Sequence, residues 1–88
     1  MSIKVIISFE VEDFGKFKSV FDAGENVRNE AGITLELHKN MDAHNNVWVI
    51  GAAASKEVFT EFLKDPSAQE RMRNGGVIQP LNITFLES

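Results

Sequence analysis

Four strand-like segments and two helix-like segments follow one another in this chain, and their order constrains the fold more than any other feature. Four segments alternate apolar and polar residues with the two-residue period of a β-strand: 3–10, 33–40, 47–53 and 77–86. Between them, residues 14–31 and 55–74 carry apolar side chains at helical spacing. The order β-α-β-β-α-β with right-handed crossovers predicts a ferredoxin-like α+β fold, in which an antiparallel sheet of strand order 4-1-3-2 has its helices on one face.

Capping residues mark the ends of the predicted helices. Asp13 and Ser55 offer side-chain oxygens to the first turns of the two helical regions. Gly32 lets the backbone leave the first region, which we expect to be one helix with Gly24 in its interior. Asp65 and Pro66 end one helix and begin a second short one, because proline suits the first helical position after an acidic cap.

The two faces of the predicted sheet differ in composition. One face is almost wholly apolar and belongs beneath the helices. The other face mixes apolar and polar side chains: Ile6, Ser8, Glu36, His38, Trp48, Ile50, Asn82 and Thr84. Because an exposed apolar patch that contains a tryptophan is unusual for a monomer, we expect this face to pack against a second copy of the chain in a homodimer.

Length and charge exclude several classes of function. The 88 residues form one domain, 1–88, without a linker or repeat. A net charge of -4 and the absence of any Lys/Arg run exclude nucleic acid and membrane surfaces as expected partners. The chain has no cysteine, no signal peptide and no transmembrane stretch, so we expect a cytoplasmic protein. Two histidines without clustered carboxylates predict no metal site.

Four segments carry a resemblance to a known superfamily: residues 9–22, 26–33, 55–63 and 83–87. They resemble the dimeric α+β barrel superfamily, above all small uncharacterised bacterial members that are similar to antibiotic biosynthesis monooxygenases. The resemblance implies a homodimer whose two sheets pack face to face as a barrel, with ligands between each sheet and its helices.

The resemblance also implies which cofactors are absent. Haem-degrading members place a tryptophan near the end of the third strand and a haem-ligating histidine after the second helical region. These positions correspond here to Ala53 and the neighbourhood of Met72, and the histidine that many members carry in the first helix corresponds to Gly24. None of the three can do the family's chemistry, so no cofactor is expected.

A first candidate site lies on the helix side of the sheet. It combines three small residues that leave room with three larger ones that would line a cavity: Gly24, Gly51 and Ala53, with Phe17, Phe21 and Met72. A dry apolar cavity suits a small aromatic molecule. Simple close packing of helix on sheet explains the same residues and is the favoured interpretation of them.

A second candidate site lies on the opposite face. Glu36 and His38 are neighbours at strand spacing, so the carboxylate could orient or charge the imidazole, and Trp48 could supply an aromatic wall for a flat substrate. The same three side chains also suit a wet subunit interface with tryptophan as its anchor. Because the second strand lies at the sheet edge, we favour the interface.

Three functions agree with these features. The first is a small dimeric barrel that binds an apolar or aromatic metabolite without catalysis. The second is a cofactor-independent monooxygenase or isomerase that uses Glu36, His38 and Trp48. The third is a structural or regulatory dimer whose cavities hold no ligand.

Overall fold

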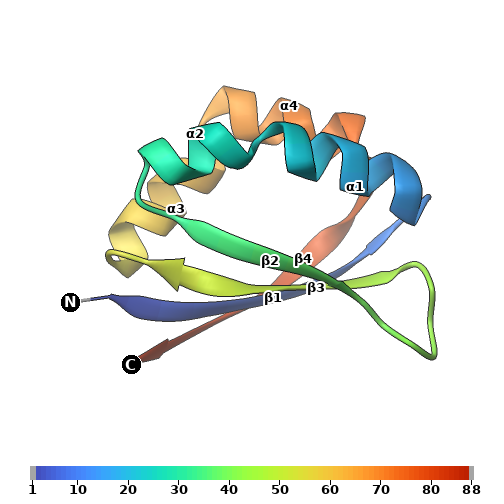
Figure 1. Ribbon diagram of the computed structural model, residues 1–88, viewed down its shortest axis with the longest axis horizontal. Coiled ribbons are helices and arrows are strands. Elements are labelled where there is room, and N and C mark those ends of the chain that lie inside the picture. The colour runs from blue at the N-terminus through green and yellow to red at the C-terminus, as the bar shows by residue number, and fades with distance from the viewer. Residues whose placement is uncertain (1, 88) are drawn as a thin grey trace.

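The computed structural model describes residues 2–87, which form four strands and four helices in the predicted order. The elements are β1 (Ile3–Val11), α1 (Phe14–Ala23), α2 (Glu25–Glu30), β2 (Thr34–Lys39), β3 (Asn46–Ala53), α3 (Lys56–Lys64), α4 (Pro66–Asn74) and β4 (Val77–Glu87) (Figure 1). No helix in this part of the chain has the length and hydrophobicity needed to cross a lipid bilayer.

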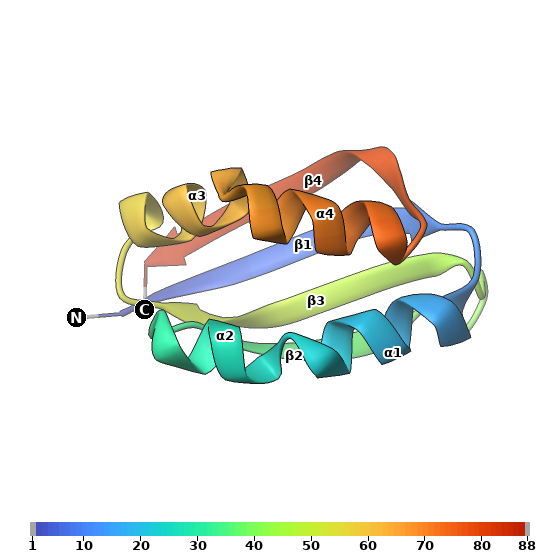
Figure 2. The same ribbon diagram turned by 90° about the horizontal axis from the view of Figure 1, so that it is seen from above.

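The sheet has the strand order β2-β3-β1-β4, and every neighbouring pair is antiparallel. Read from its other end, this is the predicted order 4-1-3-2. All four helices lie on one face of the sheet, with α1 and α2 above β2 and β3 and with α3 and α4 on the side of β4 (Figures 1 and 2). The ferredoxin-like α+β fold expected from the strand and helix pattern is therefore confirmed.

The caps at three helix starts are also as predicted. Asp13 Oδ1 accepts a hydrogen bond from the Gly15 N–H at 3.0 Å, and Ser55 Oγ accepts one from the Val58 N–H at 3.1 Å. Asp65 caps α4, which begins at Pro66. The first helical region differs from the prediction, because it forms two helices rather than one.

The break between α1 and α2 falls at Gly24. Its φ of -91° and ψ of 3° depart from helical geometry, and its N–H bonds back to the Phe21 carbonyl. The Gly24 carbonyl accepts from the Arg28 N–H, so α2 starts at once on a slightly different axis. Our expectation of an unbroken helix to Gly32 was wrong in this respect, and the low helix propensity of glycine is the physical reason.

The core lies between the helices and the predicted apolar face of the sheet. Val5 and Val47 of the sheet are fully buried there, and so is Phe59 of α3 on the helix side. Phe9 of β1 meets Phe17 of α1 edge to face, with ring centroids 5.3 Å apart. Aromatic pairs in this geometry stabilise a core by about 0.5–1.5 kcal/mol beyond the area that they bury.

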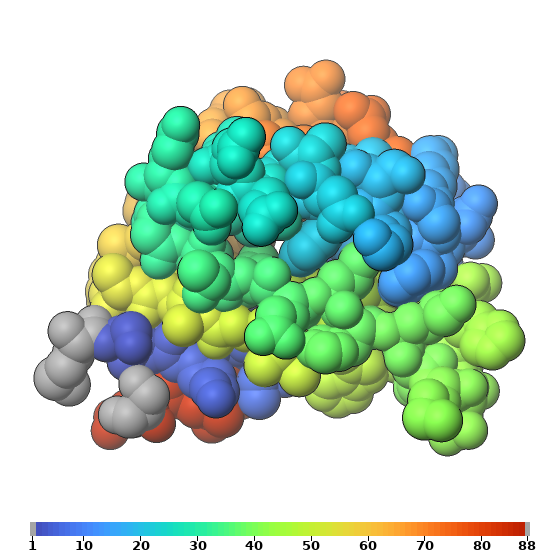
Figure 3. All heavy atoms as spheres, viewed as in Figure 1, coloured from blue at the N-terminus to red at the C-terminus, as the bar shows by residue number. Residues whose placement is uncertain are grey.

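The opposite face of the sheet carries no helix. Strand register arranges its eight predicted interface residues in two adjacent rows across all four strands: Glu36, Ile50, Ile6 and Thr84 in one, and His38, Trp48, Ser8 and Asn82 in the other. Trp48 is 40% exposed on this face. At the end of the sheet the turn between β2 and β3 projects beyond the rest of the molecule (Figure 3).

Candidate functional site

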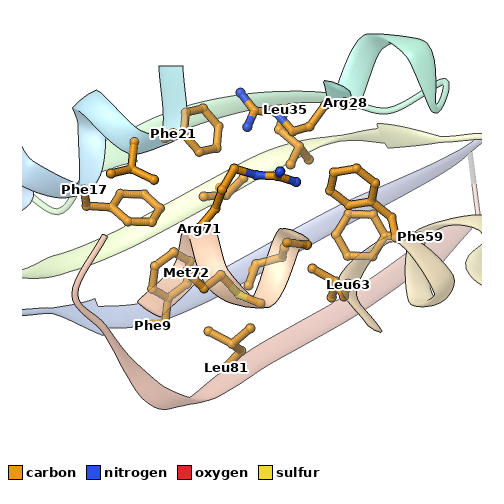
Figure 4. Close-up of a pocket in the computed structure, with 15 residues that line it drawn as sticks. Phe9, Phe17, Phe21, Arg28, Leu35, Phe59, Leu63, Arg71, Met72 and Leu81 are labelled. Atoms are coloured by element: carbon orange, nitrogen blue, oxygen red, sulfur yellow. The ribbon is translucent and has the colours of Figure 1, made fainter. Parts of the chain in front are cut away.

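A cavity of about 90 Å³ lies between the helices and the sheet. All eight elements contribute to its wall, which is apolar apart from two arginines. The larger side chains include five phenylalanines and a methionine: Phe9, Phe17, Phe21, Phe59, Phe62 and Met72 (Figure 4). The cavity is thus a pocket lined by aromatic side chains, in the core layer between the helices and the sheet.

Three of the residues predicted for this site meet in the cavity. Phe17 and Phe21 line it from α1, with ring centroids 5.8 Å apart, and Met72 lines it from α4. Ala53 is instead buried in the core near the end of β3 and forms no part of the cavity wall.

Gly51 does not leave room for a ligand as we expected. A Cβ atom at this position would collide with the carbonyl oxygen of Thr34 in the neighbouring strand. The space above Gly51 is therefore occupied by the backbone of β2. This glycine serves the close approach of two strands, which is a common reason for glycine in a sheet.

Gly24 has a different role from the one that the sequence suggested. It does not line the cavity, and a methyl group there would lie 3.1 Å from Arg28 Nη1 and 3.3 Å from Arg71 Nε. Two arginine side chains from different helices thus converge over this glycine. Figure 4 shows both guanidinium groups on the same side of the cavity, with Arg71 extending from α4 toward the α2 side.

Sequence reasoning missed both arginines, although one signal was present. Phe17, Phe21, Gly24 and Arg28 are spaced by four, three and four residues, so Arg28 occupies the apolar stripe of the first helical region. Only 7% of Arg28 is exposed. Its guanidinium carbon lies 3.9 Å from the centroid of the Phe21 ring, in a cation–π contact.

Arg28 has charged neighbours of both signs, but it forms no ion pair with any residue that the structure describes. Burial lowers the pKa of its guanidinium; Glu25 opposes this decrease, Arg71 adds to it, and Asp22 opposes it. Asp22 already forms an ion pair with Lys18, at 2.7 Å. Within residues 2–87 neither Arg28 nor Arg71 donates a side-chain hydrogen bond or forms an ion pair.

A polar groove of about 340 Å³ adjoins the cavity along the edge of β2. The groove and the cavity share Phe21, Arg28 and Leu35. Figure 3 shows a hollow between the helices and β2 on this side of the molecule. Arg28 therefore stands where an aromatic interior meets a charged surface.

The second predicted group is brought together on the open face. His38 Nε2 lies 3.6 Å from Glu36 Oε2, and His38 is paired directly with Trp48 across β2 and β3. The Trp48 indole donates to Asn46 Oδ1, and Asn46 in turn donates to Glu10. In the single chain this group lies open to solvent. No set of three metal-ligating side chains gathers anywhere in residues 2–87.

Solved structures with the same fold are numerous. A protein assigned as an antibiotic biosynthesis monooxygenase from Bordetella bronchiseptica matches 99% of this chain with 96% of its own, at a TM-score of 0.83 and 15% identity. Another protein assigned as an antibiotic biosynthesis monooxygenase, from Caulobacter crescentus, matches 99% of this chain with 89% of its own, at a TM-score of 0.75 and 18% identity.

A third structure belongs to a protein of described activity. SnoaB, a cofactor-independent oxygenase from Streptomyces nogalater, matches 94% of this chain with 90% of its own, at a TM-score of 0.74 and 16% identity. No protein-family model matches this sequence, and neither does the sequence of any curated protein. At these identities the likeness establishes the monooxygenase-type ferredoxin-like fold.

Proposed function

We propose that this protein is a cytoplasmic homodimer that binds a small aromatic metabolite in the cavity between its sheet and its helices. The observation that carries the proposal is the lining of that cavity, which takes five of the seven phenylalanines in the chain. An apolar cavity of about 150 Å³ can bind benzene, and the cavity here is smaller at about 90 Å³, so a ring would lie partly in the cavity and partly in the adjoining groove.

The dimer is proposed from the open face of the sheet. Trp48 is 40% exposed there, and Ile6 and Ile50 are only partly covered by their neighbours in the sheet. A second copy of the same face would bury this patch, in a self-complementary contact of the kind that two-fold symmetric dimers form. The polar residues of the two rows would then form the rim of the interface.

Binding can be tested with neutral one-ring compounds such as phenol and toluene, followed by NMR of the aromatic side chains. We expect saturable shifts at Phe17 and Phe21, which line the cavity. Val20→Phe should abolish binding because it fills the cavity, whereas Val58→Phe, on a half-buried valine of α3 outside the cavity wall, should not. Absence of binding by every such compound would leave a structural or regulatory dimer as the better account.

A second candidate function is oxygen chemistry on the open face without a cofactor. It is favoured by the 3.6 Å approach of Glu36 to His38, beside Trp48, and by the fold shared with SnoaB. Oxygen uptake with an anthrone or quinol substrate tests it. Turnover should be lost in His38→Ala and kept in His44→Ala, since His44 lies in the turn away from this group.

A further inference from the structure

We infer that the ligand of the aromatic cavity carries a carboxylate, and that Arg28 and Arg71 bind it. The inference rests on the proposed function of the cavity and adds the chemical class of the ligand to it. Its basis is a pair of cations that the fold brings together, neither of which forms an ion pair or a side-chain hydrogen bond with the acidic residues nearby in the 2–87 range.

Arg28 is the first part of the argument. A buried ion is strongly unfavourable unless an opposite charge or hydrogen bonds compensate for the lost water. Arg28 is 7% exposed, and its guanidinium meets a phenylalanine ring rather than a carboxylate. Arg28 is thus more than nine-tenths buried in the wall of a cavity and has no ion-pair partner among residues 2–87, which an anionic ligand could supply.

Arg71 is the second part. It reaches the same place from α4, and both side chains lie within 3.4 Å of the position that a methyl group on Gly24 would take. Two like charges at such proximity repel each other, and Arg71 indeed lowers the pKa of Arg28. Glycine at position 24 therefore permits a convergence that is unfavourable in the empty protein and favourable around an anion.

The chemistry of the pair selects a carboxylate. A guanidinium group is planar and can donate two parallel hydrogen bonds to the two oxygens of one carboxylate. In residues 2–87, every side-chain nitrogen that is fully sealed from solvent has a hydrogen-bond partner. The guanidinium nitrogens of Arg28 have no such partner in this range, so they must be accessible to solvent or to a ligand. A ring among Phe17, Phe21 and Phe59 would direct its carboxylate toward Arg71 in the cavity wall and toward Arg28, where the cavity meets the groove.

The test compares benzoate with benzamide, which has the same shape and no charge, by calorimetric titration of the whole protein at neutral pH. We expect benzoate to bind at least about tenfold more tightly, as charge-assisted hydrogen bonds imply. The preference should vanish in Arg28→Met and weaken in Arg71→Met, while Arg73→Met, on the exposed side of α4, keeps it. Arg28→Lys retains the charge and should keep part of the preference if the methionine variant does not fold.

The outcomes separate this inference from the proposed function. Equal binding of benzoate and benzamide by the native protein would overturn the carboxylate and leave the aromatic site in place. Binding of neither compound, together with no response to phenol or toluene, would overturn both. A benzoate preference that persists in Arg28→Met and Arg71→Met would show that other groups hold the anion, and would also overturn the inference.

Discussion

The indole nitrogen of Trp48 donates a hydrogen bond to Asn46 Oδ1 over 2.8 Å, two residues away on the same strand. Asn46 Oδ1 also accepts from the Asn40 amide at 2.9 Å, and Asn46 Nδ2 donates to Glu10 Oε2 at 2.6 Å. The polar edge of the largest side chain on the open face is thus satisfied within the subunit. Its apolar surface is left free to contact a partner.

Replacing Trp48 with glutamate should convert the proposed dimer to monomers or to aggregate, because a carboxylate buried without a partner at an interface is strongly unfavourable. Sedimentation equilibrium at micromolar concentration measures the mass. Val27→Glu is the matched control, since Val27 of α2 is 41% exposed, close to the 40% of Trp48, but lies on the helix side. A native protein that sediments as a monomer would refute the interface itself.

Asn46→Ala should lower the free energy of unfolding by about 1–2 kcal/mol. The substitution removes the side chain that joins Trp48, Asn40 and Glu10, and a typical hydrogen bond contributes about 1 kcal/mol net. Asn45→Ala serves as the control, because only the backbone carbonyl of Asn45 takes part in a hydrogen bond. Urea denaturation followed by Trp48 fluorescence measures both, and equal effects of the two changes would contradict the role of Asn46.

Two glycine-to-alanine substitutions should differ in how much they lower the free energy of unfolding. Gly51→Ala places a methyl group against the Thr34 backbone, which cannot move without breaking strand pairing, so we expect a loss of about 1–3 kcal/mol or more. Gly24→Ala meets only the flexible ends of Arg28 and Arg71, and its φ is negative, so stability should change by less than about 1 kcal/mol. Chemical denaturation of both variants provides the comparison, and similar losses would show that the arginines are rigidly packed.

Gly24→Ala should nevertheless reduce benzoate affinity in the same calorimetric titration. The added methyl group would stand 3.1 Å from Arg28 Nη1 and push at least one guanidinium away. A loss of binding without a loss of stability would separate the arrangement of the arginines from the packing of the helices. Unchanged affinity would indicate that the arginines can bind an anion from more than one position.

Arg28→Met should leave the free energy of unfolding of the ligand-free protein unchanged, or raise it by up to about 1 kcal/mol. An apolar side chain of similar length replaces a buried charge that has no ion-pair partner. Thermal denaturation measures the effect against Arg73→Met, an exposed arginine in the last turn of α4. A marked loss of stability would show instead that the contact with Phe21 holds α2 in place.

The strands and their faces could be read from the sequence because a two-residue period assigns each side chain to one face. That rule alone placed Trp48 beside His38 and both on the face away from the helices. The break at Gly24 and the pairing of Arg28 with Arg71 could not be read in the same way. The break reflects the low helix propensity of glycine, which a helix can also tolerate at one position. The approach of Arg71 to Arg28 depends on how far α4 lies from α2, a distance that packing of the whole core determines.

Three of the residues predicted for the binding site line the cavity and three do not, and their roles in binding remain a prediction. Phe17, Phe21 and Met72 were found because large apolar residues on a helix stripe face the sheet whatever the details of packing. Gly51 was misread because a glycine in a strand indicates close approach by another group without saying which group approaches. Here the approaching group is the Thr34 backbone rather than a ligand. The position of Arg28 on the apolar stripe of the first helical region is the signal that would have added it to the predicted cavity wall.

The close approach of Gly51 to the Thr34 backbone constrains the residue at position 51, because a larger side chain there would disturb the pairing of β2 with β3. Backbone fixes the strand pairing there, whereas side chains such as Phe62 and Met72 form parts of the cavity wall. Exchanging those side chains for smaller or larger ones would change which molecule fits while strand pairing stays as it is. A change in the proposed ligand would therefore not require a change in the backbone pairing of the sheet.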